Sequence, residues 1–89
     1  MRKIKLAIEN MPDKLALHNY LMQILHLPDY YGKNLDALYD CLTEISEPLI
    51  IAVPAAATGS GYLQGYGVQL AATLLDAASD NENLKIVIE

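Results

Sequence analysis

The chain has 89 residues, of which 53% are hydrophobic and 19% are charged, and this composition excludes an intrinsically disordered protein. Eleven acidic residues against six basic ones give a net charge of −5, which argues against nucleic acid or an anionic membrane as the main partner. A chain of this length is expected to form a single domain over residues 1–89.

The cysteine content and the lack of long apolar runs indicate the cellular compartment of the protein. The single cysteine, Cys41, excludes an internal disulfide framework and is expected to be a partly buried structural thiol. Small secreted domains usually depend on disulfides, so a cytoplasmic location is expected. The basic segment 2–5 is not followed by the apolar stretch of a signal peptide, and no apolar run approaches the roughly 20 residues of a membrane span.

The first third of the chain predicts a strand and a helix. Apolar and polar residues alternate over residues 4–8, which is typical of a half-buried strand. Asp13 is a candidate N-cap for a helix that ends before Pro28. The apolar stripe of this helix is expected to consist of Leu17, Tyr20, Leu21, Ile24 and Leu25. His18 and His26 are expected at the surface or at the end of the helix.

A loop over residues 28–33 leads to a second helix, for which Asn34 is the candidate N-cap. The buried face of this helix repeats with helical spacing and is expected to consist of Leu35, Leu38, Leu42 and Ile45. Residues 49–53 are continuously apolar and mostly β-branched, which predicts a strand covered on both faces of a parallel sheet.

The last third combines a glycine-rich segment, a helix and a strand. Residues 55–61 are small and flexible, and residues 62–64 allow a short helix. A helix from about Gly67 to Ser79 is expected to bury Val68, Ala71, Ala72, Leu75 and Ala78. After a turn, residues 84–89 alternate as a final strand. The whole pattern predicts an α/β fold, a small three-stranded parallel sheet packed with about four helices.

The second helix carries a stripe of carboxylates opposite its leucines. Asp36, Asp40 and Glu44 lie at i, i+4 and i+8, and like charges at this spacing destabilise a helix by roughly 0.2–0.5 kcal/mol per pair. Only Asp36 lies in the first turn, where the helix dipole favours negative charge. Asp76 and Asp80 repeat the spacing on the last helix. The carboxylates are either a solvated surface or an electrostatic match to a cationic partner.

Three tyrosines and two of the carboxylates are further candidate functional residues. Tyr30, Tyr31 and Tyr39 lie beside the acidic residues and are typical of interface anchors, unless one or two of them fold onto the core. Asp36 and Asp40 could form an acid–base pair or bind a hard cation, but an exposed helix face gives no burial to separate their pKa values.

The segment 59–65 resembles a dinucleotide fingerprint, but its spacing is GxGxxxG in place of GxGxxG, and a flexible turn is the simpler interpretation. A small ligand-binding α/β domain that uses this segment is the weakest of the hypotheses. No catalytic residue, metal site or cofactor is therefore expected.

The stretch 27–43, with its core YYGKNLDALYDCL, resembles the signature of the barstar family of intracellular ribonuclease inhibitors. The resemblance covers the chain from end to end, although the N-terminal strand and residues 54–67 match only in outline. It implies a barstar-like fold and a non-enzymatic inhibitor, or toxin immunity protein, of a guanyl-type ribonuclease. The second helix and its preceding loop would enter the active site, where their carboxylates mimic RNA phosphates.

The resemblance also implies roles for single residues. Asp40 matches the central aspartate that occupies a phosphate site, Asp36 the second helix aspartate, and Tyr30 the tyrosine that packs on the catalytic histidine of the nuclease. Asp76 and Asp80 match acidic rim positions. The complete expected partner-binding set is Tyr30, Tyr31, Gly32, Asn34, Leu35, Asp36, Tyr39, Asp40, Thr43, Glu44, Asp76 and Asp80.

Departures from the family pattern concern the rim of this surface. Tyr39 stands where members often have tryptophan, Glu44 and Ile45 replace a Gly-Trp pair, and Glu82 stands where a second cysteine occurs. The expected partner is a basic extracellular or toxin ribonuclease, barnase-like, bound 1:1 by a monomer, without direct contact to nucleic acid or membrane. The alternative is a non-inhibitory interaction or regulatory module that kept the fold, with self-association as one form of it.

Overall fold

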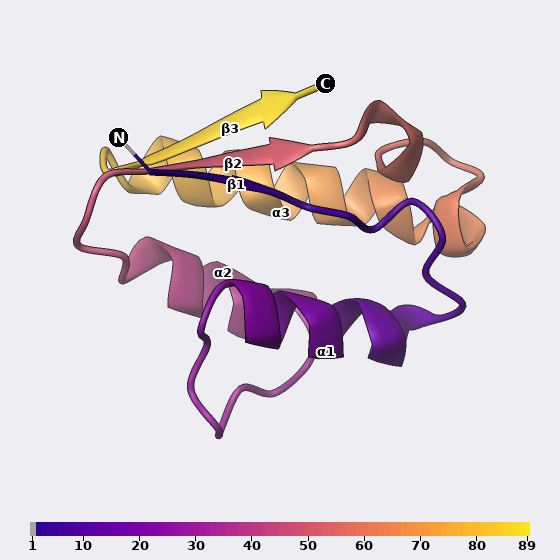
Figure 1. Cartoon of the computed structure of the whole chain (residues 1–89), viewed down its shortest axis with the longest axis horizontal. Coiled ribbons are helices and arrows are strands. Elements are labelled where there is room, and N and C mark those ends of the chain that lie inside the picture. Colours follow the sequence, from indigo (N-terminus) through magenta and orange to yellow (C-terminus); the bar gives the residue numbers. More distant parts are fainter. Residues whose placement is uncertain (1) are drawn as a thin grey trace.

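A computed structural model describes residues 2–89 and shows a small parallel sheet with α-helices against it (Figure 1). Two short 3₁₀ helices, η1 and η2, connect the second strand to the last helix. The elements in chain order are β1 (Arg2–Lys5), α1 (Lys14–Ile24), α2 (Leu35–Thr43), β2 (Leu49–Val53), η1 (Ala55–Ala57), η2 (Tyr62–Gly65), α3 (Tyr66–Asp80) and β3 (Leu84–Ile88).

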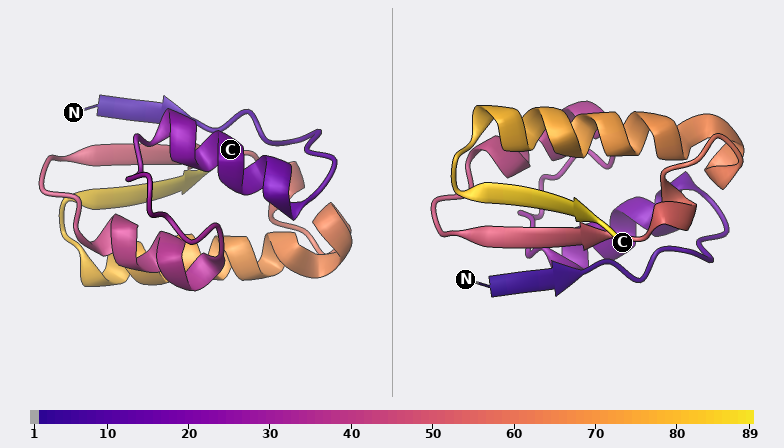
Figure 2. Two further views of the ribbon diagram at one scale, coloured as in Figure 1. Left: turned by 90° about the horizontal axis from the view of Figure 1, so that it is seen from below. Right: turned by 90° about the horizontal axis from the view of Figure 1, so that it is seen from above.

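The sheet has the strand order β1-β2-β3, with both pairs parallel, as the sequence predicts. Ile4, Ile51 and Ile86 lie side by side across the three strands. The three α-helices lie on one side of this sheet (Figure 1), and no helix in the described part of the chain crosses the strands in the view from above (Figure 2). The expectation that β2 is covered on both faces holds only in part: no described α-helix covers the second face, where Ile50 is partly buried but Ala52 is 1% exposed.

Both predicted helix starts are confirmed by their caps. The Asp13 side chain accepts a hydrogen bond from the backbone N–H of Ala16 at 2.8 Å, and Asn34 accepts one from Ala37 at 2.8 Å. Each bond satisfies one of the N–H groups that lack a partner in the first turn of a helix. These caps set where α1 and α2 begin.

The core lies between the sheet and the three helices, and α3 contributes to it with a different face from the one predicted. Val68 is 51% exposed and Leu75 is 47% exposed, so the predicted stripe is wrong. The buried residues of α3 are Tyr66, Gly67, Leu70, Leu74 and Ala77. The two stripes have the same helical spacing and differ by a rotation of the helix, which tight packing at Gly67 fixes.

The structure has three α-helices within residues 2–89, which corrects the expected number of about four. The segment between β2 and α3 forms two 3₁₀ turns in place of a fourth helix. Leu63 and Gln64 adopt left-handed backbone angles, with φ of 45° and 58°, and Gly65 follows at 96°. A right-handed helix cannot continue through such residues, because each of them reverses the helical turn. No helix in the described residues is long and apolar enough to cross a membrane.

Candidate protein-binding face

The predicted carboxylate stripe lies on the solvent side of α2. Leu38 and Leu42 are fully buried, and Asp36, Asp40 and Glu44 are exposed on the other side of the helix. Asp36 lies in the first turn, where it interacts favourably with the helix dipole, whereas Glu44 lies at the C-cap, where the dipole disfavours a negative charge. The arrangement leaves three carboxylates free to meet a partner.

Tyr39 joins this stripe to the acidic pair on α3. The Tyr39 hydroxyl donates a hydrogen bond to the Asp80 carboxylate across the contact between α2 and α3. This bond raises the pKa of Tyr39, and the negative charges of Asp80, Asp76 and Asp40 raise it further. Three carboxylates from two helices therefore surround one phenol. We call the combined surface the acidic face, and it consists of Asp36, Asp40, Glu44, Asp76 and Asp80.

Asn81, which was not among the predicted site residues, fixes the end of α3 against α2. Its side-chain amide donates to the backbone oxygens of Leu42 at 2.9 Å and Ile45 at 3.0 Å, and the residue is buried. The Leu42 oxygen belongs to the C-terminal turn of α2, whose carbonyls lack partners within the helix, and Ile45 follows the C-cap Glu44. Only the position of Asn81 in a predicted turn could have indicated this role.

The loop before α2 places its two adjacent tyrosines in opposite environments. Tyr30 is 85% exposed in the loop that leads into α2, as an interface anchor would be. Tyr31 is only 5% exposed, so the structure corrects its expected place on the surface. Its side chain belongs to the core and cannot serve as an exposed anchor.

Tyr31 is held in the core by a histidine. The Tyr31 hydroxyl lies 2.5 Å from Nδ1 of His18, and the Tyr66 hydroxyl lies 2.7 Å from Nε2 of the same ring. His18 is 1% exposed, so its expected surface position is wrong, whereas His26 lies at the end of α1 as predicted. Burial lowers the pKa of His18 and raises those of Tyr31 and Tyr66. A neutral histidine between two tyrosines thus supports the loop that displays Tyr30.

The other predicted contact residues shape the start and the end of α2. The Asn34 amide donates to the backbone oxygen of Gly32 at 3.2 Å, which closes the loop before the helix. Leu35 is partly buried against the core, and the Thr43 hydroxyl donates to the backbone oxygen of Asp40 at 2.9 Å. These side chains are engaged within the protein, so any contact with a partner would involve their exposed atoms and the backbone of the loop.

Cys41 lies between the leucine side of α2 and the acidic face, and it is partly buried as expected. Burial raises the pKa of its thiol, and the nearby Glu44 and Asp40 raise it further. A thiol with a raised pKa is a poor nucleophile because little of it is thiolate. Within residues 2–89, no group of three or more ligating side chains lies close enough to hold a metal ion.

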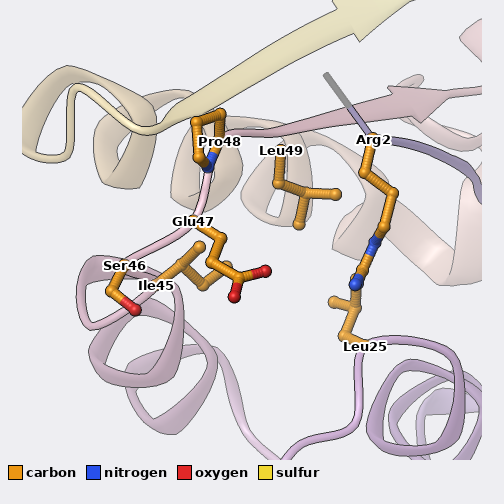
Figure 3. Close-up of a pocket in the computed structure, with 7 residues that line it drawn as sticks. All are labelled: Arg2, Leu25, Ile45, Ser46, Glu47, Pro48 and Leu49. Atoms are coloured by element: carbon orange, nitrogen blue, oxygen red, sulfur yellow. The ribbon is translucent and has the colours of Figure 1, made fainter.

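A small cavity of about 200 Å³ lies where β1 and β2 begin (Figure 3). The side chains of Arg2 and Glu47 project into it, and apolar side chains form much of its wall. It is lined by Arg2, Leu25, Ile45, Ser46, Glu47, Pro48 and Leu49. The cavity is smaller than the roughly 300–1,000 Å³ of typical ligand pockets, and none of the predicted site residues lines it. The carboxylates of the acidic face lie outside this cavity.

Fold and surface together define a small parallel α/β protein with an exposed acidic face and an exposed tyrosine in the loop before α2. The chain belongs to the barstar family, since the family model described as "Barstar (barnase inhibitor)" matches residues 1–89. It is also 34% identical over 91 residues to "Putative ribonuclease inhibitor YrdF" of Bacillus subtilis (strain 168), with 100% of both chains covered. The family and this relative are described as inhibitors and not as enzymes, in agreement with the expectation of no catalysis.

Proposed function

We propose that this protein inhibits a basic, guanyl-type ribonuclease by covering its active site with the acidic face. The observation that carries the proposal is the acidic face of five exposed carboxylates, three of which act on the Tyr39 hydroxyl, on a chain whose family and relative are described as ribonuclease inhibitors. A ribonuclease must present cations where it holds RNA phosphates, so an acidic face matches that site in charge. The proposal includes binding inside the cell, one inhibitor to one enzyme.

Asp40 has the central role in this proposal. It lies midway between Asp36 and Glu44 on α2, and its charge also reaches the Tyr39 hydroxyl beside Asp80. Its carboxylate would occupy the position of a substrate phosphate and pair with the cations of the nuclease. Asp36 would pair with a neighbouring cation, and the remaining carboxylates would contact the rim. Inhibition is then simple occlusion, with no covalent step.

Tyr30 supplies the apolar part of the contact. A tyrosine that is 85% exposed loses a large area of water contact when a partner covers it. Aromatic residues of this kind often carry much of the binding free energy of an interface. Tyr31 would act indirectly, because its bond to His18 holds the loop in the conformation that displays Tyr30.

The test is a titration of the protein into a barnase-type ribonuclease, with RNA cleavage as the readout. The parent should inhibit stoichiometrically, and Asp40→Ala should raise the dissociation constant at least about 30-fold, as for a residue of an interface hot spot. Glu9→Ala is the matched control, since it removes one exposed carboxylate outside the acidic face and should change the constant less than threefold.

Two outcomes would contradict the proposal. A parent protein that does not inhibit the enzyme would refute the barnase-like target. Equal affinities for Asp40→Ala and the parent, with inhibition intact, would refute the central role of Asp40 and show that another surface of the chain makes the contact.

A further inference from the structure

The side of the sheet that faces away from the helices is open and carries lysines. Strand register places Lys3, Ile50 and Lys85 in one row across the sheet. In the view from above, no described helix lies over the strands (Figure 2). We call this surface the sheet face, and it consists of Lys3, Lys5, Ile50, Ala52, Lys85 and Val87, with Glu89 at its edge bonded to Lys3. Ala52 is covered by its neighbours and is 1% exposed.

This open face is unusual for a parallel sheet. Such sheets are almost always covered on both faces, because their strands are apolar on both sides. Here Ile50 and Val87 remain partly exposed between the lysines, and the three lysines are exposed. An uncovered apolar strip with charges around it resembles an interface, where an apolar centre lies within a polar rim.

The sheet face carries three lysines and the Glu89 carboxylate, so the sign of its charge is opposite to the net charge of the whole protein. Three of the six basic residues lie here, on a chain with a net charge of −5. Lys3 is paired with Glu89 at 3.0 Å, whereas Lys5 and Lys85 form no ion pair within residues 2–89. Two unpaired cations thus lie on opposite edge strands, with apolar residues between them.

The spacing of these cations matches that of the carboxylates on α2. Lys5 and Lys85 are separated by two strand spacings and two residues, which is about 12 Å along the diagonal of the sheet. Asp36 and Glu44 are eight residues apart, which is also about 12 Å along a helix. A helix laid on this diagonal brings its two outer carboxylates over the two unpaired lysines.

We propose that the sheet face binds the acidic face of a second copy of this chain. The two surfaces lie on different parts of the molecule, so each copy can offer one surface and accept the other. Such a head-to-tail contact does not close into a dimer by symmetry, and assemblies therefore lengthen with concentration. The contact is independent of the proposed function, although it covers the same carboxylates and would compete with a nuclease for them.

Sedimentation velocity at low salt, without any nuclease, tests this contact with two complementary variants. Lys5→Gln/Lys85→Gln keeps only the acidic face competent, and Asp36→Asn/Glu44→Gln keeps only the sheet face. The parent should associate reversibly at millimolar concentration, and each variant alone should stay monomeric. An equimolar mixture of the variants should form a 1:1 dimer and nothing larger. Salt at about 0.5 M should dissociate it, because exposed charges are then screened within a few ångströms.

Lys14→Gln/Lys33→Gln is the control, because it changes the net charge equally but leaves the sheet face intact. It should associate as the parent does. The proposal is overturned if the parent stays monomeric, if either variant alone associates like the parent, if the mixture does not form a dimer, or if the control also loses association. None of these results depends on whether the protein inhibits a ribonuclease.

Discussion

Tyr39 is the residue on which the continuity of the acidic face depends. Asp40, Asp76 and Asp80 come from two helices, and without a donor among them their charges would repel one another across the contact. The Tyr39 hydroxyl donates to Asp80, and the surrounding charges raise the pKa of the phenol. A raised pKa keeps the hydroxyl protonated, so it remains a donor at any physiological pH.

Replacing Asp80 should therefore change the titration of Tyr39. Asp80→Asn removes the charged acceptor that contributes most to the raised pKa of Tyr39, so that pKa should fall towards the ordinary value of 10.0. An NMR titration that follows the Tyr39 ring carbons measures it. Glu82→Gln is the control, because Glu82 is exposed nearby but does not contribute to the raised pKa. An unchanged Tyr39 titration in Asp80→Asn would show that the bond across α2 and α3 does not form.

At the scale of single elements, α1 ends in a motif that usually has glycine just after the C-cap, and here His26 occupies that position. His26 has a φ of 54°, and the N–H of Leu27 donates to the oxygen of Met22 at 2.9 Å. This is the Schellman arrangement, in which the residue after the C-cap takes the left-handed conformation. A side chain makes that conformation costly, whereas glycine adopts it freely.

His26→Gly should consequently raise the free energy of unfolding by about 0.5–1 kcal/mol, since the relief of the left-handed strain exceeds the added flexibility of the unfolded chain. Urea unfolding followed by circular dichroism measures the change. Gln23→Gly is the matched control within the same helix, and it should lower the free energy of unfolding by about 1 kcal/mol. A loss of stability in His26→Gly would mean that the imidazole makes a contact worth more than the strain.

The position of α3 depends on one residue near its start, Gly67. A Cβ atom on Gly67 would lie 2.4 Å from the backbone oxygen of Ala57 and 2.9 Å from that of Gly59. Backbone atoms cannot move aside as a flexible side chain can, so α3 would have to shift away from η1. The close approach at Gly67 therefore holds the helix in the rotation that buries Leu70 and Leu74.

Gly67→Ala should lower the free energy of unfolding by about 1–3 kcal/mol, the usual cost of overpacking a close contact. Gly61→Ala is the control, because nothing lies within 4 Å of its added Cβ and its φ of −82° suits alanine. That variant should be neutral or slightly more stable. Thermal and urea unfolding of both variants measure the difference, and equal stabilities would contradict the role assigned to Gly67.

These elements show which parts of the fold the sequence predicts and why others escape prediction. The caps at Asp13 and Asn34 and the strand at 49–53 follow from local chemistry, and all three are confirmed. The rotation of α3 was predicted wrongly, because alanines occur on several sides of the helix and its true buried face depends on contact with η1, which is distant in sequence. The left-handed residues Leu63 and Gln64 carry no local signal.

At the scale of the whole molecule, the predicted carboxylates could be found because like charges at i, i+4 have no structural reason to be there. Their exposure is as expected, although their contact with a nuclease stays a prediction. Tyr31 and His18 were misplaced for the opposite reason. Each looks like a surface residue until the other is packed against it, and the third partner, Tyr66, comes from a different helix. Such a buried polar cluster depends on the whole fold.

This cluster makes the stability of the protein depend on pH. Burial lowers the pKa of His18 below 6.5, so the folded protein keeps the ring neutral where the unfolded chain takes up a proton. The unfolded state then binds more protons than the folded state, and stability must fall as the pH drops below about 6.5 towards the lowered pKa. The groups that face the ring are the hydroxyls of Tyr31 and Tyr66, and Lys14 lies 4.6 Å from the centre of the Tyr66 ring. No carboxylate is among them to favour the charged ring.

Urea unfolding between pH 8 and pH 5.5, above the range where most carboxylates titrate, should show this loss as a slope of at most about 1.4 kcal/mol per pH unit. His18→Gln should be less stable than the parent at pH 8, because it disturbs both tyrosine bonds, but its stability should change less with pH. His26→Gln, which removes the exposed histidine, should keep the parent slope. If His18→Gln also keeps that slope, the pH dependence arises elsewhere and His18 does not stay neutral in the fold. If the slope is lost in His18→Gln but kept in His26→Gln, the contact between His18 and Tyr31, which holds the loop of Tyr30, weakens as the pH falls.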